Sequence, residues 1–128
     1  MSKLDDLISA AKNEDWRLVD RTIPQICNKK TYVEWAYKKG LKHLKDNVRD
    51  LAASILEKTK ALTSGMKERL YYVMKDDSNP YAKFRAACAL AAHDRKYHSD
   101  EVKQALEIAK KDKGISGIAE GYLKKYNP

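Results

Sequence analysis

Apolar residues recur at intervals of three and four along almost the whole chain, and the strict alternation typical of a strand is absent. Only 3 prolines and 5 glycines interrupt this pattern. The pattern predicts an all-helical protein, and the short joints between helices imply antiparallel neighbours. The expected helices cover residues 2–12, 15–27, 30–44, 47–61, 64–75, 80–93, 99–111 and 114–125.

Four of these helices share a related pattern of residues. Segments 46–56 and 81–92 align so that an apolar residue followed by arginine falls at the same place in both. Segments 15–24 and 114–123 extend this alignment in both directions. The equivalent positions are separated by 32, 36 and 31 residues, which is typical of a repeat of two helices. They are Arg17, Arg49, Arg85 and Ser116.

This pattern resembles the HEAT and HEAT-like repeat family from about residue 14 to 125. It combines an Asp or Asn, an apolar-Arg pair, small residues three and four positions later, and an apolar residue at seven. The resemblance implies a right-handed α-α superhelix, or solenoid, of about three and a half helical-hairpin repeats within one domain, 1–128. In that family the second helix of each repeat lines the concave, usually partner-binding, face. The expected units are a capping helix over 1–12 and repeats over 14–45, 46–78, 79–112 and 113–128.

The pattern also leads to expectations about how individual helices pack. The segment 80–93 is apolar nearly all round, as a central helix should be. Gly114, Gly117 and Gly121 share one side of the last helix, and glycine lowers helix stability unless close packing compensates. We therefore expect this side to lie tightly against residues 80–111. Cys27 and Cys88 fall on expected core faces.

Composition then points to the kind of partner. The formal charge of +8 and a pI near 9.4 favour a polyanion, because neutralising phosphates releases counterions. The excess is local, since residues 29–46 carry six basic and two acidic side chains, and residues 79–98 carry four and one. Acidic residues are scattered among the lysines elsewhere, so an ordinary solvated surface is the alternative interpretation.

The helix expected over residues 30–44 carries the chain's second tryptophan. Winding it at 100° per residue places Trp35 opposite the apolar stripe, among basic side chains. An exposed indole there would stack on a base or anchor a protein partner, unless an adjacent helix covers it. The stripe expected in the core consists of Val33, Ala36, Tyr37, Gly40, Leu41 and Leu44.

A shorter motif, "WRLVD", places Trp16 and Asp20 one helical turn apart. Asp20 is expected on the inward side of its helix, where it would accept hydrogen bonds from the next helix or pair with Arg49. The motif also resembles the Trp-x-x-x-Asp motif of the DNA-alkylation-repair glycosylases, which are HEAT-like solenoids that hold DNA on a basic concave face. That resemblance implies that Asp20 stabilises positive charge on the sugar of a lesion, that Trp16 packs nearby, and that Arg49 contacts the DNA backbone.

No other catalytic or metal-binding pattern stands out. The cysteines lie 61 residues apart, His93 and His98 flank a probable joint, and neither a phosphate-binding loop nor a nucleophile motif is present. No metal or cofactor is expected. The chain also lacks the apolar run of a signal peptide or membrane span, so we expect a cytoplasmic protein with reduced thiols and no membrane partner.

The sequence therefore predicts a non-catalytic binding module that acts as a monomer or weak homodimer. Its partner, a protein or a nucleic acid, stays open. The alternative is an enzyme of the DNA-glycosylase type with Asp20 as its carboxylate. The residues expected to bind the partner are Tyr32, Trp35, Lys38, Lys39, Lys42, Arg49, Lys67, Tyr72 and Lys75.

Overall fold

The computed structural model describes residues 3–126, which form helices and connections and contain no strand. The all-helical prediction is confirmed. Most helix ends fall within a few residues of the predicted ones, because polar caps mark several of them. The Asp15 side chain accepts a hydrogen bond from the backbone N–H of Leu18, and the Asn79 side chain accepts hydrogen bonds from those of Tyr81 and Ala82. The helices are α1 (Lys3–Lys12), α2 (Trp16–Ile26), α3 (Lys30–Lys38), the short 3-10 helix η1 (Gly40–Lys42), α4 (Asp46–Lys58), α5 (Ser64–Asp76), α6 (Pro80–His93), α7 (Ser99–Ala109) and α8 (Ser116–Tyr126).

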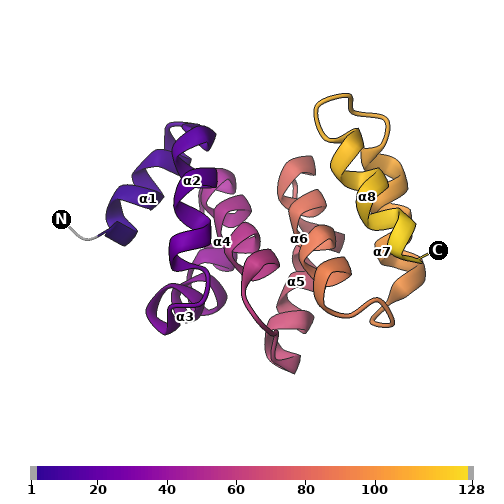
Figure 1. Ribbon diagram of the computed structural model, residues 1–128, viewed down its shortest axis with the longest axis horizontal. Helices are drawn as coiled ribbons and strands as arrows, with labels where there is room; N and C mark the ends of the chain where they lie inside the picture. Colours follow the sequence, from indigo (N-terminus) through magenta and orange to yellow (C-terminus); the bar gives the residue numbers. More distant parts are fainter. Residues whose placement is uncertain (1–2, 127–128) are drawn as a thin grey trace.

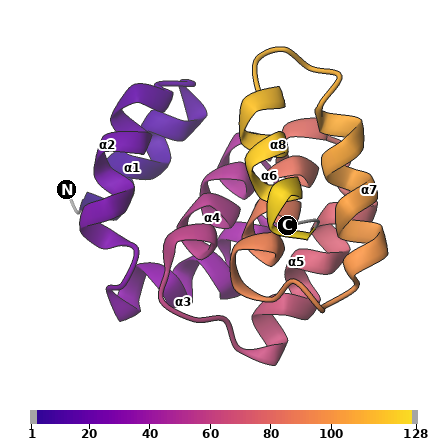
Figure 2. The same ribbon diagram turned by 45° about the vertical axis from the view of Figure 1, so that its right-hand side comes forward.

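Four helices form a central row that runs along the molecule. α2 contacts α4, α4 contacts α6, and α6 contacts α8. Figure 1 shows these helices in that order from left to right, with α1 at one end and α7 and α8 at the other. The remaining helices flank the row, and Figure 2 shows α5 and α7 beyond α6 and α8. The four helices of the central row are those that the sequence pattern relates to one another.

Each central helix has a flanking helix that precedes it in the chain. The close pairs are α1 with α2, α3 with α4, α5 with α6, and α7 with α8, whereas α2 and α3, and likewise α4 and α5, are not in close contact. The repeats expected from the sequence begin one helix later than these pairs. Sequence similarity between helices gives the length of a repeat. It does not show whether each helix pairs with the helix before it or with the helix after it.

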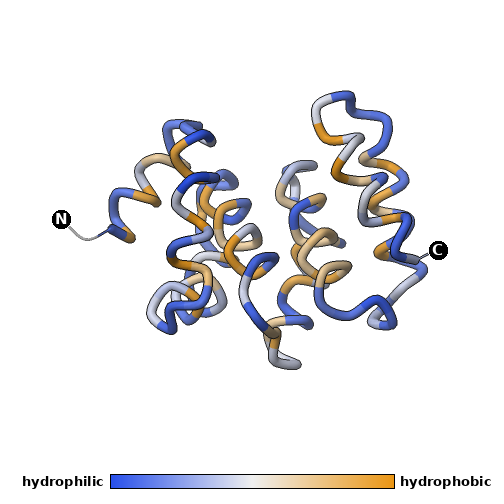
Figure 3. The backbone as a smooth tube through the Cα atoms, viewed as in Figure 1, coloured by the Kyte–Doolittle hydropathy of each residue, from blue (hydrophilic) through white to orange (hydrophobic). Residues whose placement is uncertain are grey.

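The core lies between α4 and α6. Every residue from Leu51 to Leu56 in α4 is buried, and so is every residue from Ala86 to Ala91 in α6. Alanine dominates the second run, and its small side chain lets the two backbones approach closely. Cys27 and Cys88 are buried free thiols, as expected for packing residues. Hydrophilic residues gather in connections such as the one between α7 and α8, blue in Figure 3.

Hydrogen bonds that involve polar side chains link parts of the chain about one repeat apart at a regular spacing. The partners of these bonds lie 27 to 33 residues apart in the chain, close to the period of the sequence pattern. The same kind of joint therefore recurs along the molecule. The pairs are Asn28–Lys60, Asp46–Asn79, Arg49–Asp77, Glu57–Arg85, Lys67–Asp94, Tyr71–Glu101 and Tyr81–Asp112.

The helix expected over residues 30–44 departs from its prediction. It ends at Lys38 and continues as η1, and a Cβ on Gly40 would lie only 2.6 Å from the Cβ of Ala52 in α4. The change in winding turns Leu44 outward, and 97 % of it is exposed. Its expected place in the core is wrong. The expectation of a solvent-facing Trp35 is wrong as well, because this side chain is only partly exposed and packs against the core and Gly40.

The glycines of the last helix also differ from expectation. Gly117 and Gly121 are exposed, and a Cβ on either would meet nothing within 4 Å. Instead, α8 packs on its neighbours through Ala119 and Leu123, which are buried. The predicted close packing of the glycine side against residues 80–111 is therefore wrong.

Candidate binding surfaces

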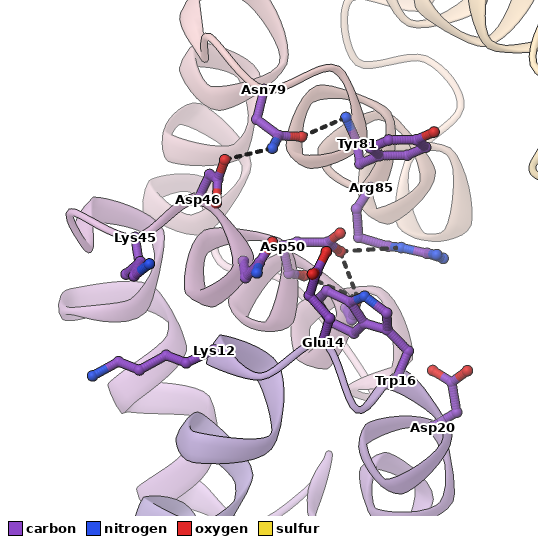
Figure 4. Close-up of a pocket in the computed structure, with 12 residues that line it drawn as sticks. Lys12, Glu14, Trp16, Asp20, Lys45, Asp46, Asp50, Asn79, Tyr81 and Arg85 are labelled. Carbon is purple, nitrogen blue, oxygen red and sulfur yellow. Dashed lines mark hydrogen bonds and ion pairs between the residues drawn. The ribbon is translucent and has the colours of Figure 1, made fainter.

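A cavity of about 660 Å³ opens over the central row, and we call it the hollow. Its walls come from the end of α1, the first turns of α2, and one side of α4 and α6, so it spans three successive central helices (Figure 4). Two aromatic side chains and several charged ones face it. The lining residues are Lys12, Glu14, Trp16, Asp20, Lys45, Asp46, Asn47, Asp50, Ser54, Asn79, Tyr81 and Arg85.

Both residues of the "WRLVD" motif reach the hollow. The cap at Asp15 starts α2 at Trp16, and Asp20 follows one turn later on the same face. Trp16 is partly buried and packs against the core, while Asp20 is exposed and makes no hydrogen bond or ion pair among residues 3–126. The expected inward position of Asp20 and its pairing with Arg49 are wrong. The motif therefore presents an unpaired carboxylate beside an indole.

The floor of the hollow is a chain of paired charges. Arg85 donates from Nη1 to Glu57 at 3.1 Å, and its Nε lies 3.7 Å from an Oδ of Asp50. The hydroxyl of Tyr122 in α8 donates to the other carboxylate oxygen of Glu57. Because little of these carboxylates is exposed, pairing is what makes their burial tolerable. This network of side chains joins α4, α6 and α8 beneath the hollow.

Asp50 has an unusual proton affinity. Burial raises the pKa of its carboxyl from 3.8 to about 6, and the negative charges of Glu57 and Asp20 act in the same direction. The charge of Arg85 and a hydrogen bond from Ser54 oppose this rise. Burial, together with the hydrogen bond to Glu57, likewise raises the pKa of the Tyr122 hydroxyl. The hollow thus contains one carboxyl that changes charge near neutral pH.

The hollow carries both signs of charge. Lys12, Lys45 and Arg85 face four carboxylates, those of Glu14, Asp20, Asp46 and Asp50, and Arg85 is already shared between Asp50 and Glu57. A phosphate backbone is bound by an excess of positive charge, which this surface lacks. The hollow is therefore not the basic face that the sequence predicted.

None of the nine residues expected to bind a partner lines the hollow. Three of them, Lys42, Arg49 and Tyr72, meet instead at a second cavity of about 490 Å³. It lies between the segment that precedes α4 and the last turns of α5, and we call it the Leu44 groove. Its other lining residues are Leu41, His43, Leu44, Arg69, Val73, Asp76, Asp77 and Ser78.

The remaining expected binding residues do not form one trough. Lys67 is paired with Asp94 at 2.9 Å. The ammonium group of Lys75 lies 3.6 Å from Glu101 and 5.2 Å from the centre of the Tyr71 ring. Local partners therefore engage these two charges. On α3 and just after it, Tyr32 and Trp35 are partly buried, whereas Lys38 and Lys39 are exposed.

Arg49 has a structural task that the sequence did not reveal. Its guanidinium makes two hydrogen bonds to the Asp77 carboxylate and two more to the carbonyls of His43 and Leu44, which uses four of its five N–H donors. Only one donor therefore remains for the contact with a DNA backbone that the resemblance implies, and that contact stays a prediction.

The residues of the floor were not predicted from the sequence, although a signal was present. Asp50 and Glu57 are seven residues apart, so they lie on one face of α4, and the residues between them are almost all apolar. Two carboxylates on one side of a buried helix require cationic or hydroxyl partners. Arg85 and Tyr122 fill that need.

Comparisons with protein-family models, with curated proteins and with solved structures found no match. Within residues 3–126, none of the helices combines the length and the apolar character needed to cross a bilayer. The same part of the chain contains no group of three or more His, Cys, Asp or Glu residues placed to hold a metal ion.

Proposed function

We propose that the chain is a HEAT-like solenoid that serves as a non-catalytic binding module, and that it holds a segment of a partner protein in the hollow. The contacts along the central row and the polar joints spaced 27 to 33 residues apart support the repeat architecture. Two buried free cysteines agree with the cytoplasm as the proposed compartment.

The open carboxylate of Asp20 beside Trp16, at the wall of a cavity that crosses three helices, carries this proposal. A peptide segment offers apolar, polar and charged groups in alternation, which suits walls that combine aromatic rings with both signs of charge. A uniform polyanion fits such walls poorly. The geometry therefore favours a protein over a nucleic acid, the two partners that the sequence left open.

A photo-crosslinking residue in place of Asp20 tests this proposal in the cells that express the protein. The matched control carries the same residue in place of Gln104, which is exposed on α7 and lines neither cavity. We expect a discrete crosslinked species at position 20, sensitive to protease and resistant to nuclease, and none at position 104. Nuclease-sensitive adducts at position 20, or the same species at both positions, would contradict a protein partner in the hollow.

A second candidate is a DNA-repair activity of the alkylation-repair glycosylase type. The observation in its favour is that Trp16 and Asp20, the two fixed positions of the motif, both face the hollow. In this case the purified protein releases alkylated bases from DNA, and Asp20→Asn abolishes the release. Asp100→Asn, at an exposed position on α7, serves as the control and keeps the activity. Equal release by both variants, or none by the wild type, excludes the enzyme.

A further inference from the structure

The Leu44 groove lies outside the hollow and has a different chemistry. We propose that it is a second docking surface, which takes an apolar side chain from an acidic helical segment of a partner protein. Leu44 and Tyr72 stand at its edge, 97 % and 52 % exposed, while Leu41 and Val73 form a buried floor. Exposed leucine and tyrosine around an apolar floor are the kind of contact that dominates binding energy in protein interfaces.

Hydrogen bonds hold Leu44 in this outward position. Nη1 of Arg49 donates to the carbonyl of His43 at 2.8 Å and to that of Leu44 at 3.1 Å, and the next backbone N–H, of Lys45, donates to Nδ1 of His43 at 3.0 Å. Arg49 is itself fixed by Asp77. A free loop would fold such a leucine onto the nearby apolar floor. A leucine fixed in water instead is prepared for a partner, because little conformational freedom is lost on binding.

The charges around the groove indicate the sign of that partner. Lys42 and Arg69 make no ion pair among the described residues, while the charge of Arg49 is balanced by Asp77. Burial, with the neighbouring charges of Lys12 and Arg49, lowers the pKa of His43, which keeps its imidazole neutral at pH 7. Asp76 is the one unpaired acid of the lining. An acidic segment therefore complements this surface.

Two other occupants fit the groove less well. A second copy of the chain would bring another positively charged surface, which repels the first. A nucleic acid would supply the negative charge, but it has no aliphatic side chain to cover Leu44. A helix with glutamates on its polar face and leucines on the other meets both requirements.

The test uses the full chain and three synthetic peptides of one length. The first is an amphipathic helix of leucine and glutamate, the second has lysine in place of glutamate, and the third has serine in place of leucine. Fluorescence anisotropy measures the affinities, and chemical shifts of ¹⁵N-labelled protein locate the site. We expect the first peptide to bind at the backbone amides of residues 41–45 and 69–73, and the other two at least about tenfold more weakly.

Leu44→Ala separates binding from folding, because a side chain 97 % exposed adds little to stability. We expect about a tenfold loss of affinity with an unchanged Tm. Ile108→Ala, at an aliphatic residue 61 % exposed on α7, is the matched control and keeps the affinity. Tyr72→Ala provides a second variant on the opposite edge and weakens binding as well.

Several results would overturn the proposal. They are an acidic peptide that does not bind, equal affinities of the Leu44→Ala and Ile108→Ala proteins, or shift changes that gather around Trp16 and Asp20. Binding of DNA that is weakened by Leu44→Ala would assign the groove to a nucleic acid instead. Trp16→Ala leaves peptide binding at the groove unchanged, so failure of the hollow as a site does not decide this test.

Discussion

Arg49 and Asp77 join two successive helical pairs through two parallel hydrogen bonds, with Nε 2.6 Å from Oδ2 and Nη2 3.0 Å from Oδ1. The same guanidinium holds the segment that leads into α4. Asp77 also accepts a hydrogen bond of 2.9 Å from the backbone N–H of Asn79, just before α6. One ion pair thus fixes the entry of one central helix to the entry of the next.

We predict that Arg49→Ala lowers the free energy of unfolding by about 2–3 kcal/mol, because it leaves a buried carboxylate without its cation. The Asp77 side chain is only 4 % exposed in the pair. Urea unfolding at pH 7 measures the change. Lys30→Ala is the control, since Lys30 and Glu34 are 88 % and 47 % exposed at 3.8 Å, and we expect less than about 0.5 kcal/mol there. Equal losses in the two variants would contradict a special role for Arg49.

Two glycines should respond to alanine in opposite directions. At Gly40 the new methyl group would lie 2.6 Å from the Cβ of Ala52 and 3.1 Å from the Trp35 ring, so a loss of about 1–3 kcal/mol is expected. At Gly121, inside α8, the methyl group meets open space, and alanine gains about 0.5–1 kcal/mol through its higher helix propensity. Thermal unfolding of both variants checks the signs. A stabilising Gly40→Ala would show that η1 does not need its close contact with α4.

The helices could be predicted because their signals are local. Asp15, Thr63 and Asn79 cap α2, α5 and α6, and each lies next to the apolar periodicity that it starts. The central place of α6 was also readable, because an element that is apolar on all sides has to be surrounded. Such features depend on neighbours in the sequence alone.

The candidate sites depended on contacts that the sequence does not state. A regular helix past Lys38 would have buried Leu44, but the approach of Gly40 to Ala52 changes the winding there. Arg49 and Arg85 occupy equivalent positions in the repeat, yet one binds Asp77 in a connection and the other binds carboxylates of α4. Which acid is within reach is decided by tertiary packing. Trp16 and Asp20 were correctly placed on one face of α2. That face was expected to turn toward the core, whereas Asp20 is exposed.

The hydroxyl of Tyr122 should contribute to stability over a long sequence separation. It donates to the carboxylate of Glu57, 65 residues earlier, and so fastens α8 to α4. Tyr122→Phe leaves Glu57 with Arg85 as its partner, and we expect a loss of about 1–2 kcal/mol. Hydrogen exchange should locate the effect in α8 and the end of α4. Tyr72→Phe, at an exposed residue whose hydroxyl makes no hydrogen bond within residues 3–126, should change stability little by the same measurement.

The carboxyl of Asp50 should make stability fall as the pH rises from about 4 to 7. Its pKa is near the ordinary value of 3.8 in the unfolded chain and about 6 in the folded protein, where burial is the main cause. Between these values the folded state keeps a proton that the unfolded state has lost. Each unit of difference corresponds to about 1.4 kcal/mol, so by pH 7 this group alone costs about 2.5 kcal/mol relative to pH 4, where a small part of the loss has already occurred.

Asp50→Asn removes this titration, although it also deprives Arg85 of one partner at every pH. The informative quantity is therefore the difference in unfolding free energy between wild type and variant, measured in urea at several values from pH 4.5 to 7.5. Relative to the wild type, the variant should become more stable as the pH rises from 4.5 to about 6, and the difference should level off above about pH 6.5. Asp100→Asn, at an exposed position, should follow the wild type throughout. If the Asp50→Asn curve also runs parallel to the wild type, the carboxyl is already ionised in the folded protein and Arg85, rather than burial, controls its charge.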